Sequence, residues 1–541
     1  MMFRMCARVI LAVAIGLVVS PGAAQTGGDT TAALTPQAGP PPPPPMTMSL
    51  ADAVRMSLQN NLDIKVAEKT PEIRQQDVIF QDAVFDPNFG FSALKSNFTR
   101  PTQNLFDIDP NLISSQGVEV VGIQGTFQEY KAGFHDPLKW GGNYTASLAA
   151  QRQSSNSSNE LFPTTYRAVL EMVYDQSFLR SFGRDVNETQ IIISRNNEEI
   201  SRSQLREQAL VALQQTEDAY WELVFARQDL DVKLQSLGLA GELLKLNRIK
   251  VQVGTLPPIE ITTAEAEVAS RDQAVIIAEN AVRDSEDNLR KVINMPKDNG
   301  AWERPIEPTD QPVFVERAVD LEKDLSQARD SRPNLQEARL NVKSAESQLE
   351  YDRRQRRWDL TGRVVYRREG LAGDIPANRT LFGNPVPPQN ENYNNAFALT
   401  GDRDFETWTV GGFLNIPIGN HALDSSFVGS RLVKEQSEVS YQNALLGAEI
   451  EVRAAARAIA TNQRRIEAAE KNVELQRKKV EAEQKKFENG MSTSFQVLEF
   501  QEDLTTALGQ KNRALVDYRK SITSLEKAKG TLDSYLNVSV R

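Results

Sequence analysis

Apolar residues recur at steps of three, four and seven over most of the chain. In the second half, Ile466, Val473 and Val480 step by seven, and the positions between them are rich in charge. The first half shows the same spacing in Ala264, Val268, Val275, Ala278, Val282, Leu289 and Val292. This spacing is typical of coiled-coil helices that bury one narrow apolar seam. It predicts helices over 185–253 and 424–489, each about 100 Å long at 1.5 Å per residue.

A second pattern, the alternation of apolar and polar residues, marks five shorter segments. They are 85–93, 143–151, 168–178, 360–367 and 407–416. In 143–151, Tyr144 and Leu148 share one face, whereas Thr145 and Ser147 lie on the other. Strands of about ten residues with one apolar face fit either the wall of an outer-membrane barrel or a soluble antiparallel sheet. The strands alone leave both interpretations open.

The N-terminus has the three parts of a secretory signal peptide. Arg4 and Arg8 precede an apolar run at 9–19, and small residues follow up to Ala24. Because a spanning helix needs about 20 apolar residues, the run favours export with cleavage near Ala24 over a retained anchor. Residues 25–46 include six consecutive prolines and are expected to be an extended tether. Export and the long flanking helices together favour the barrel interpretation of the strands.

The chain also repeats itself. The turn Val-Gly-Thr at 253–255 corresponds to Asn-Gly-Met at 489–491, and the apolar positions after the two turns match. We therefore expect a tandem duplication. The first repeat covers 47–300, with strands at about 85–178 and a helical hairpin whose tip lies near 254. The second repeat covers 311–541, with strands at about 358–418 and a hairpin tip near 490.

The first repeat is the longer of the two. Its extra residues fall between Phe85 and Gly254, mostly in the strand region. Strand character at 118–123 and 143–151 predicts an added β-hairpin around 117–152, with its turn near Gly141 and Gly142. The pattern leaves open whether this hairpin joins the same sheet as the other strands.

Charge and motif content exclude several classes of function. The formal net charge is −10, and it becomes −12 if Arg4 and Arg8 leave with the signal peptide, which argues against a nucleic-acid binder. The single Cys precludes a disulfide framework or a cysteine zinc site. The phosphate-binding GxxxxGK, the metalloprotease HExxH, CxxC and the GxSxG elbow are all absent. We therefore expect no enzyme, no cofactor and no metal.

Several short segments carry a family resemblance. Residues 49–62 begin Ser-Leu-Ala-Asp-Ala-Val and end Gln-Asn-Asn-Leu, and 85–87 reads Phe-Asp-Pro. Residues 177–184 and 416–419, the latter Ile-Pro-Ile-Gly, resemble strand-to-helix exits. In this order, and with the duplication, they resemble the TolC family of outer-membrane efflux and secretion channels. Ser177 departs from the proline that this family usually has there.

The resemblance implies a mainly α fold with β. Long antiparallel coiled-coil helices would form a periplasmic tunnel, and at least four strands per protomer would enter a trimeric outer-membrane β-barrel. The implied function is a passive channel-tunnel in the outer membrane, the outer component of an efflux or type I secretion system. Its partners would be two further copies, a periplasmic adaptor protein, an inner-membrane pump and outer-membrane lipid. The alternative is a soluble periplasmic coiled-coil adaptor or scaffold.

The same resemblance places the functional residues at the helical tips. Glu260, Gln496 and Glu499 would line the periplasmic aperture, where Gln496 departs from the acid that the family often has. Three copies of Glu499 around a narrow opening would favour cations. The alternative is that Glu260 and Glu499 are ordinary acids near helix N-termini. Residues at the turns would contact the adaptor, namely Gly254, Thr255, Gly490 and Met491.

Overall fold

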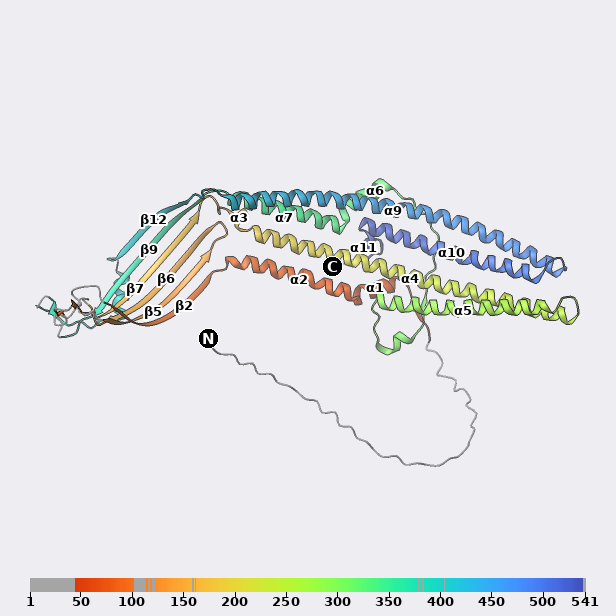
Figure 1. Ribbon diagram of the computed structural model, residues 1–541, viewed down its shortest axis with the longest axis horizontal. Helices are drawn as coiled ribbons and strands as arrows, with labels where there is room; N and C mark the ends of the chain where they lie inside the picture. The colour runs from red at the N-terminus through yellow and green to blue at the C-terminus, as the bar shows by residue number, and fades with distance from the viewer. Residues whose placement is uncertain are drawn as a thin grey trace, which may run out of the picture. The chain divides into compact units, whose positions relative to one another are not determined.

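The computed structural model of the chain is shown in Figure 1. It describes residues 44–101, 113–114, 117–118, 122–157, 160, 162–377, 380–381, 384–402 and 404–538. The chain divides into two compact units, Met1–Pro44 and Pro45–Arg541, and all elements below belong to the second. The signal peptide with Ala24, and the tether up to residue 43, lie outside the described residues.

Four long helices form two antiparallel hairpins. Helix α4 (Thr189–Gln252) pairs with α5 (Ile259–Val292), and α9 (His421–Glu488) pairs with α10 (Ser494–Lys529). A separate short helix, α3 (Arg184–Asn187), precedes α4, so the expected helix over 185–253 is broken once near its start. The prediction of long antiparallel helices is confirmed.

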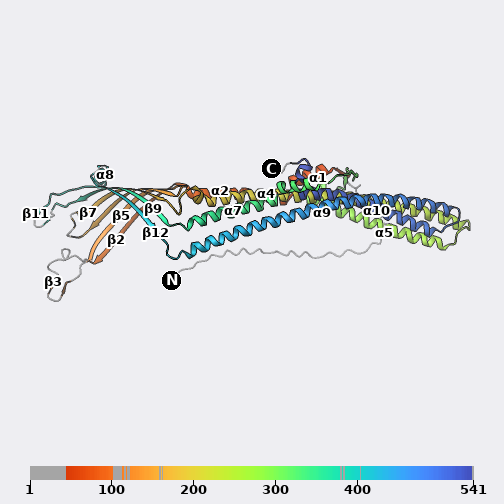
Figure 2. The same ribbon diagram turned by 90° about the horizontal axis from the view of Figure 1, so that it is seen from above.

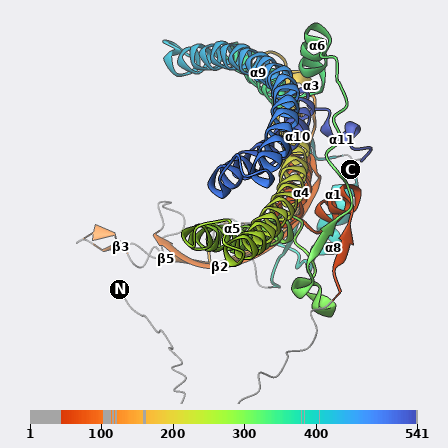
Figure 3. The same cartoon turned by 90° about the vertical axis from the view of Figure 1, so that its right-hand side faces the viewer.

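Two shorter helices complete the layer toward the sheet. Helix α2 (Leu62–Asp82) packs on α4, and α7 (Pro333–Gln355) packs on both α4 and α9. Across the layer, the helices therefore lie side by side in the order α2, α4, α7, α9 near the sheet. Near the tips, the order is α5, α4, α10, α9. Viewed along the helices, these elements form one curved layer (Figure 3).

The seams of this layer are those that the apolar spacing predicts. Ile466, Val473, Val480 and Phe487 are all buried, as are Val275 and its neighbours in the first hairpin, Ala264, Ala278, Val282 and Leu289. A coiled-coil side chain at such a position is enclosed by residues of the facing helix, which removes its apolar surface from water. Most charged positions between them remain on the surface, whereas Arg271, Glu286 and Glu483 are buried.

Smaller elements lie on the convex side of the helical layer. Strand β1 (Met46–Met48) runs parallel to β8 (Ile306–Pro308), next to η4 (Asp298–Glu303). Helices α1 (Leu50–Asn60), α6 (Leu321–Ser331) and α11 (Leu532–Tyr535) lie on the same side (Figures 2 and 3). The largest buried cluster joins β1, α1 and β8 to α4 and α5 through Tyr220, Trp221 and Leu289.

Six antiparallel strands form one sheet beyond the ends of α2, α4, α7 and α9. Their spatial order is β12-β9-β7-β6-β5-β2. The strands are β2 (Asn88–Pro101), β5 (Gly122–Pro137), β6 (Gly142–Ser155), β7 (Thr164–Ser177), β9 (Asp359–Asp374) and β12 (Glu406–Asn415). Four strands thus come from the first half of the chain and two from the second. The two edge strands, β2 and β12, have no further strand partner among the described residues.

The β-hairpin expected in the first half of the chain lies inside this sheet. Strands β5 and β6 form a hairpin between β2 and β7, with a tight turn in which Gly141 has φ of +91°. The expected strand at 118–123 has the wrong bounds: Val118 belongs to the small strand β4 (Gly117–Val118), and β5 begins only at Gly122. Strand β4 pairs with β3 (Ile113–Ser114).

The strand register confirms one apolar face and one polar face. The apolar face carries Phe91, Leu148, Leu170 and Val410, together with Phe89, Tyr130, Phe134, Tyr144, Met172, Tyr174, Val364, Tyr366 and Trp408. On the opposite face, charged side chains pair across strands. Arg363 Nε on β9 donates to Asp175 Oδ1 on β7 at 2.6 Å, and Arg167 on β7 pairs with Glu369 on β9. Glu369 also bonds Arg367, two residues away on its own strand, at 3.1 Å.

Two smaller expectations are corrected. Phe85 ends the helical turn η1 (Ala83–Phe85), and the first strand starts at Asn88 rather than at 85. The segment 372–395 is rich in Gly, Asn and Pro, which predicts exposed loops between strands, but it continues β9 to Asp374 and includes β10 (Thr380–Leu381) and β11 (Asn384–Pro385). It also starts helix α8 (Tyr393–Gly401), which packs on β7 and β9.

Candidate functional site at the helical tips

Both hairpin tips reverse the chain with the same backbone device. Gly254 and Gly490 have φ of +79° and +72°, a left-handed conformation that glycine adopts without steric cost. The residue after each glycine donates its backbone N–H to the carbonyl five residues back: Thr255 to Lys250 O at 2.8 Å, and Met491 to Lys486 O at 2.9 Å. These bonds satisfy carbonyls that the helix end would otherwise leave free.

The tip residues are open to solvent. Gly254, Thr255 and Gly490 are exposed, and the side chain of Met491 is 72% exposed. The Thr255 hydroxyl is directed inward and donates to Lys250 O at 2.9 Å. Thr493 caps the start of α10 by accepting from Gln496 N. The two tips therefore offer solvent-exposed turns, each with an exposed apolar side chain beside its glycine: Val253 at the first tip and Met491 at the second.

Side chains tie the two hairpins together just behind the tips. The ammonium group of Lys250 donates to Phe487 O at 3.2 Å and lies 4.0 Å from the centre of the Phe487 ring. The buried hydroxyl of Ser494 donates to the Glu260 carboxylate. Glu260 is half-buried, so it lies at the contact between the first hairpin and α10 rather than projecting freely.

The other two expected aperture residues are exposed. Gln496 Oε1 accepts from the Ser492 hydroxyl at 3.0 Å. Glu499 has no ion-pair or hydrogen-bond partner among the described residues, and it borders a groove of about 630 Å³ between α5 and α10. Asp503 borders the same groove but bonds Lys479 at 3.0 Å. The structure thus separates Glu499, an unpaired acid, from Glu260, which contacts Ser494.

Arg271 is a site residue that the sequence analysis missed. Its side chain is 4% exposed and donates to Ser236 O and Leu498 O, both at 3.0 Å. It also donates to Gln501 Oε1 at 3.3 Å and pairs with Glu267. One arginine therefore bonds α4, α5 and α10 together. The available signal was its position, because Arg271 interrupts the series of apolar seam residues between Val268 and Val275.

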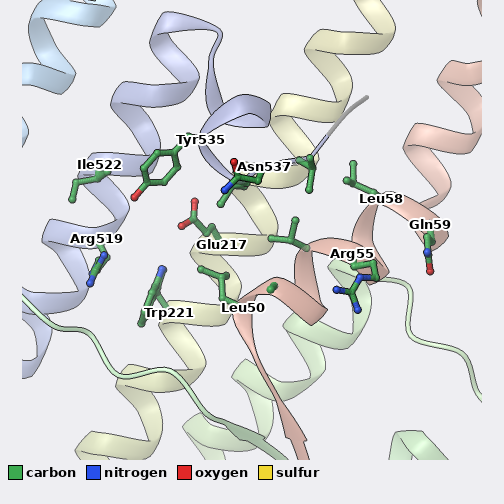
Figure 4. Close-up of a pocket in the computed structure, with 14 residues that line it drawn as sticks. Leu50, Arg55, Leu58, Gln59, Glu217, Trp221, Arg519, Ile522, Tyr535 and Asn537 are labelled. Carbon is green, nitrogen blue, oxygen red and sulfur yellow. The ribbon is translucent and has the colours of Figure 1, made fainter. Parts of the chain in front are cut away.

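A pocket of about 690 Å³ lies farther from the tips, between α1, α4, α10 and residues 535–538 (Figure 4). The Glu217 side chain projects toward it between Trp221 and Tyr535. Its carboxyl accepts from the Thr523 hydroxyl at 2.6 Å, which joins α4 to α10. Burial raises the pKa of Glu217 to about 7, although the Thr523 hydrogen bond and the charge of Arg519 act in the opposite direction. This carboxyl changes charge near neutral pH.

We expect this group to make stability depend on pH. The pKa of Glu217 rises from 4.5 to about 7 on folding, so its stabilising contribution is complete below pH 4.5 and is lost as pH rises through 7. The full loss is on the order of 3 kcal/mol. In denaturant unfolding from about pH 5.5 to about pH 8.5, Glu217→Gln should therefore lose less stability than wild type. Glu68→Gln, at an exposed position of α2, is the control. Equal pH dependence in all three proteins would contradict the assignment.

The described residues contain neither a membrane-spanning helix nor a metal-binding cluster. None of the helices in these residues is both long enough and apolar enough to cross a membrane. Within the same part of the chain, no group of three or more His, Cys, Asp or Glu side chains could hold a metal ion.

Comparison with known proteins identifies the architecture. Residues 325–531 match the sequence model of the family described as Outer membrane efflux protein. No curated protein matches the chain in sequence. The fold matches the CmeC outer membrane channel of Campylobacter jejuni, with 17% identity, a TM-score of 0.58 and coverage of 89% of this chain and 86% of CmeC.

Two further structures show the same fold. The outer membrane protein VceC of Vibrio cholerae has 13% identity and a TM-score of 0.59, over 89% of this chain and 96% of VceC. The open state of the MtrE outer membrane channel of Neisseria gonorrhoeae has 15% identity and a TM-score of 0.57, over 89% of each chain. Residues 325–531 are thus similar to the outer membrane efflux protein family, and the fold of the chain is that of the outer membrane channels it matches.

Proposed function

We propose that three copies of this chain form a passive channel through the outer membrane and a tunnel in the periplasm. The sheet carries this proposal, because it combines a broad apolar face with two unpaired edge strands, β2 and β12. In lipid, each unpaired backbone group costs several kcal/mol, so an open sheet is not viable as a spanning structure. Joining β2 of one copy to β12 of the next would close the barrel and remove every edge.

The other strand face fits the inside of such a barrel. Its ion pairs, such as Arg363 with Asp175 and Arg367 with Glu369, would face water in the lumen. The soluble adaptor is not supported by the comparisons, since the matching structures are outer membrane channels. Detergent-dependent extraction separates the two, because a soluble adaptor would appear in the periplasmic fraction without detergent.

We expect the purified protein to be a trimer in detergent. Six strands leave two edges on one copy, and three curved helical layers would enclose one tunnel. Light scattering should give three times the protomer mass. A stable monomer in mild detergent would contradict the edge-closure argument.

We further propose that the tips are the periplasmic end and meet a periplasmic adaptor linked to an inner-membrane pump. Gly254, Thr255, Gly490 and Met491 would form the contact, which the exposure of Thr255 and Met491 supports. A photo-crosslinker at Met491 should capture the adaptor in cells, whereas one at the buried Val480 should not.

We also propose that acidic and polar residues line an aperture at the tips, and that the chain is a tandem duplication. Glu499, together with Gln496 and Glu260, would surround the narrow end of the tunnel. The repeats 47–300 and 311–541 would each supply one long helix and one partner helix at the tips. The similar lengths of α4, with 64 residues, and α9, with 68, support that division.

A further inference from the structure

We propose that helix α8 and a basic row beside it form a binding surface for the phosphate headgroup of an anionic lipid in the outer leaflet. The inference rests on the proposed outer-membrane function, which defines the apolar face of the sheet as the lipid-facing one. Its basis is the place of α8 on that face and two cations, Lys95 and Arg152, that have no acidic partner in the part of the chain that the structure describes.

Helix α8 is seated on a platform of small residues. Gly370, Ala168 and Ala372 lie beneath it, and the two alanines are fully buried with Ala396 of α8. A Cβ atom on Gly370 would lie 1.9 Å from Ala396 O, so only glycine lets the helix approach this closely. The Thr400 hydroxyl donates to Ala168 O at 3.2 Å and fixes the other end of the helix.

The register places this platform on the apolar face. Gly370 pairs with Ala168, Ala168 with Ala150, and Ala150 with Tyr130. The next row toward the helical layer contains Leu170 and Leu148, paired with each other. Helix α8 therefore lies on the side of the sheet that would face lipid, on the side where α1 and α11 also lie (Figures 2 and 3).

Tyrosines near the two ends of the sheet indicate where α8 would lie along the membrane normal. Tyr144 and Tyr174 pair near the end of the sheet that adjoins the helical layer, and Tyr166, which contacts Tyr393 of α8, lies near the opposite end of β7. Tyr166 and Tyr174 are eight residues apart on β7, about 20 Å along the membrane normal for a strand tilted by about 40°. Aromatic belts at about this spacing mark the two interfaces of an outer-membrane barrel. Helix α8 thus lies at the outer interface.

A basic row crosses the sheet at the same depth. Lys95, Gln128, Arg152 and Tyr166 occupy successive paired positions on β2, β5, β6 and β7. Lys95 and Arg152 are two strand spacings apart, about 10 Å. Neither has a carboxylate partner among the described residues, and the Arg152 guanidinium lies 5.9 Å from the centre of the Tyr166 ring.

A polar group of α8 adjoins this row. The Tyr393 ring packs edge-on against Tyr166 at 5.0 Å, and its hydroxyl is buried without a hydrogen-bond partner among the described residues. Arg368 lies at the other end of α8 and is not part of the proposed binding surface. It donates to Gly401 O at 3.3 Å, and it is paired in register with Glu406 on the neighbouring strand β12. Asp374, one row further out, accepts from Glu391 N at 3.0 Å.

These features fit a phosphate attached to acyl chains rather than a free anion. Lys95 and Arg152 supply charge-assisted hydrogen bonds to phosphate oxygens, for which arginine has a matching planar fork. Tyr130 is 47% exposed and Phe397 of α8 is 38% exposed, so apolar surface adjoins the cations on the side toward the bilayer centre. A lipid satisfies both parts at once.

The test uses the purified trimer in nanodiscs that contain phosphatidylglycerol and phosphatidylcholine in equal amounts. Native mass spectrometry then counts the lipid retained after release into detergent. Wild type should retain phosphatidylglycerol preferentially, and Lys95→Gln with Arg152→Gln should reduce this about tenfold, as expected for loss of one to two charged contacts. Lys131→Gln is the matched control, because Lys131 follows Tyr130 on β5 but lies on the opposite face.

A second variant addresses the helix itself. Gly370→Leu displaces α8 from its seat and should also reduce phosphatidylglycerol retention, while the trimer mass stays unchanged. Unchanged retention in the Lys95/Arg152 double variant overturns the inference, as does displacement of the lipid by millimolar inorganic phosphate. Different results would contradict the proposed function itself, namely a wild-type protein that is monomeric or that is released from cells without detergent.

Discussion

Replacing Glu499 with lysine is expected to change the channel from cation-preferring to anion-preferring. In the trimer, three exposed Glu499 carboxylates would face a narrow aqueous opening with protein walls. Such walls concentrate the field of a charged ring on the permeating ions. Glu499→Gln should remove much of the cation preference at neutral pH, and Glu499→Lys should reverse the sign of the reversal potential in a salt gradient across a planar bilayer.

Asp503 provides the internal control for this prediction. It lies one helical turn beyond Glu499 and borders the same groove, but its carboxylate is already paired with Lys479. Asp503→Asn should therefore change the reversal potential little. Equal and negligible effects of Glu499→Gln and Asp503→Asn would falsify the ring and leave Glu499 as a solvated acid near the helix start.

Replacing Arg271 with leucine is expected to loosen the contact between the two hairpins near their tips. Leucine continues the apolar series of Val268 and Val275, so the first hairpin keeps its own seam. However, Ser236 O and Leu498 O lose a buried charged donor. Removing one partner of a buried charged network costs on the order of 3 kcal/mol. Denaturant unfolding should show this loss, and single-channel conductance should rise because the tips are less constrained.

Arg248→Leu is the matched control for Arg271. Arg248 also joins α4 to α5, through Glu265 at 2.8 Å, but its side chain is 57% exposed. An exposed ion pair contributes about 0–1 kcal/mol, so this variant should change stability and conductance little. If Arg271→Leu and Arg248→Leu behaved alike, Arg271 would not be the bond that holds the hairpins together.

The helical part of the fold follows closely from local sequence. Each seam is encoded by apolar residues within one or two turns of one another, so the spacing of Val473, Val480 and Phe487 suffices to place the buried side of α9. The role of Arg271 could not be predicted, because it donates to the backbone carbonyls of Ser236 and Leu498, which are distant in sequence. No periodicity can report a bond of that kind.

The sheet was only partly accessible from sequence. Alternation identified five of the six strands, but β5 has glycine at Gly125 and Gly133, which weakens the pattern. The structure explains Gly125, since a Cβ atom there would lie 2.4 Å from the Phe98 ring. Helix α8 was missed because it is short and its seat depends on Gly370, in a different element.

The same limit applies to the candidate site. The turns at Gly254 and Gly490 were visible in sequence because a positive φ demands a particular residue type. The contact between Glu260 and Ser494 was not, since it joins the two hairpins across more than two hundred residues of chain.

Single-channel recording tests the central claim most directly. The purified protein, added to a planar lipid bilayer without nucleotide or any other protein, should insert and produce discrete steps of ionic current. A passive conduit predicts current at every applied voltage with no energy source, and it predicts cation preference that Glu499→Lys reverses. The contradicting result is a correctly folded trimer that inserts but never conducts, both as wild type and as the Arg271→Leu variant with its less constrained tips.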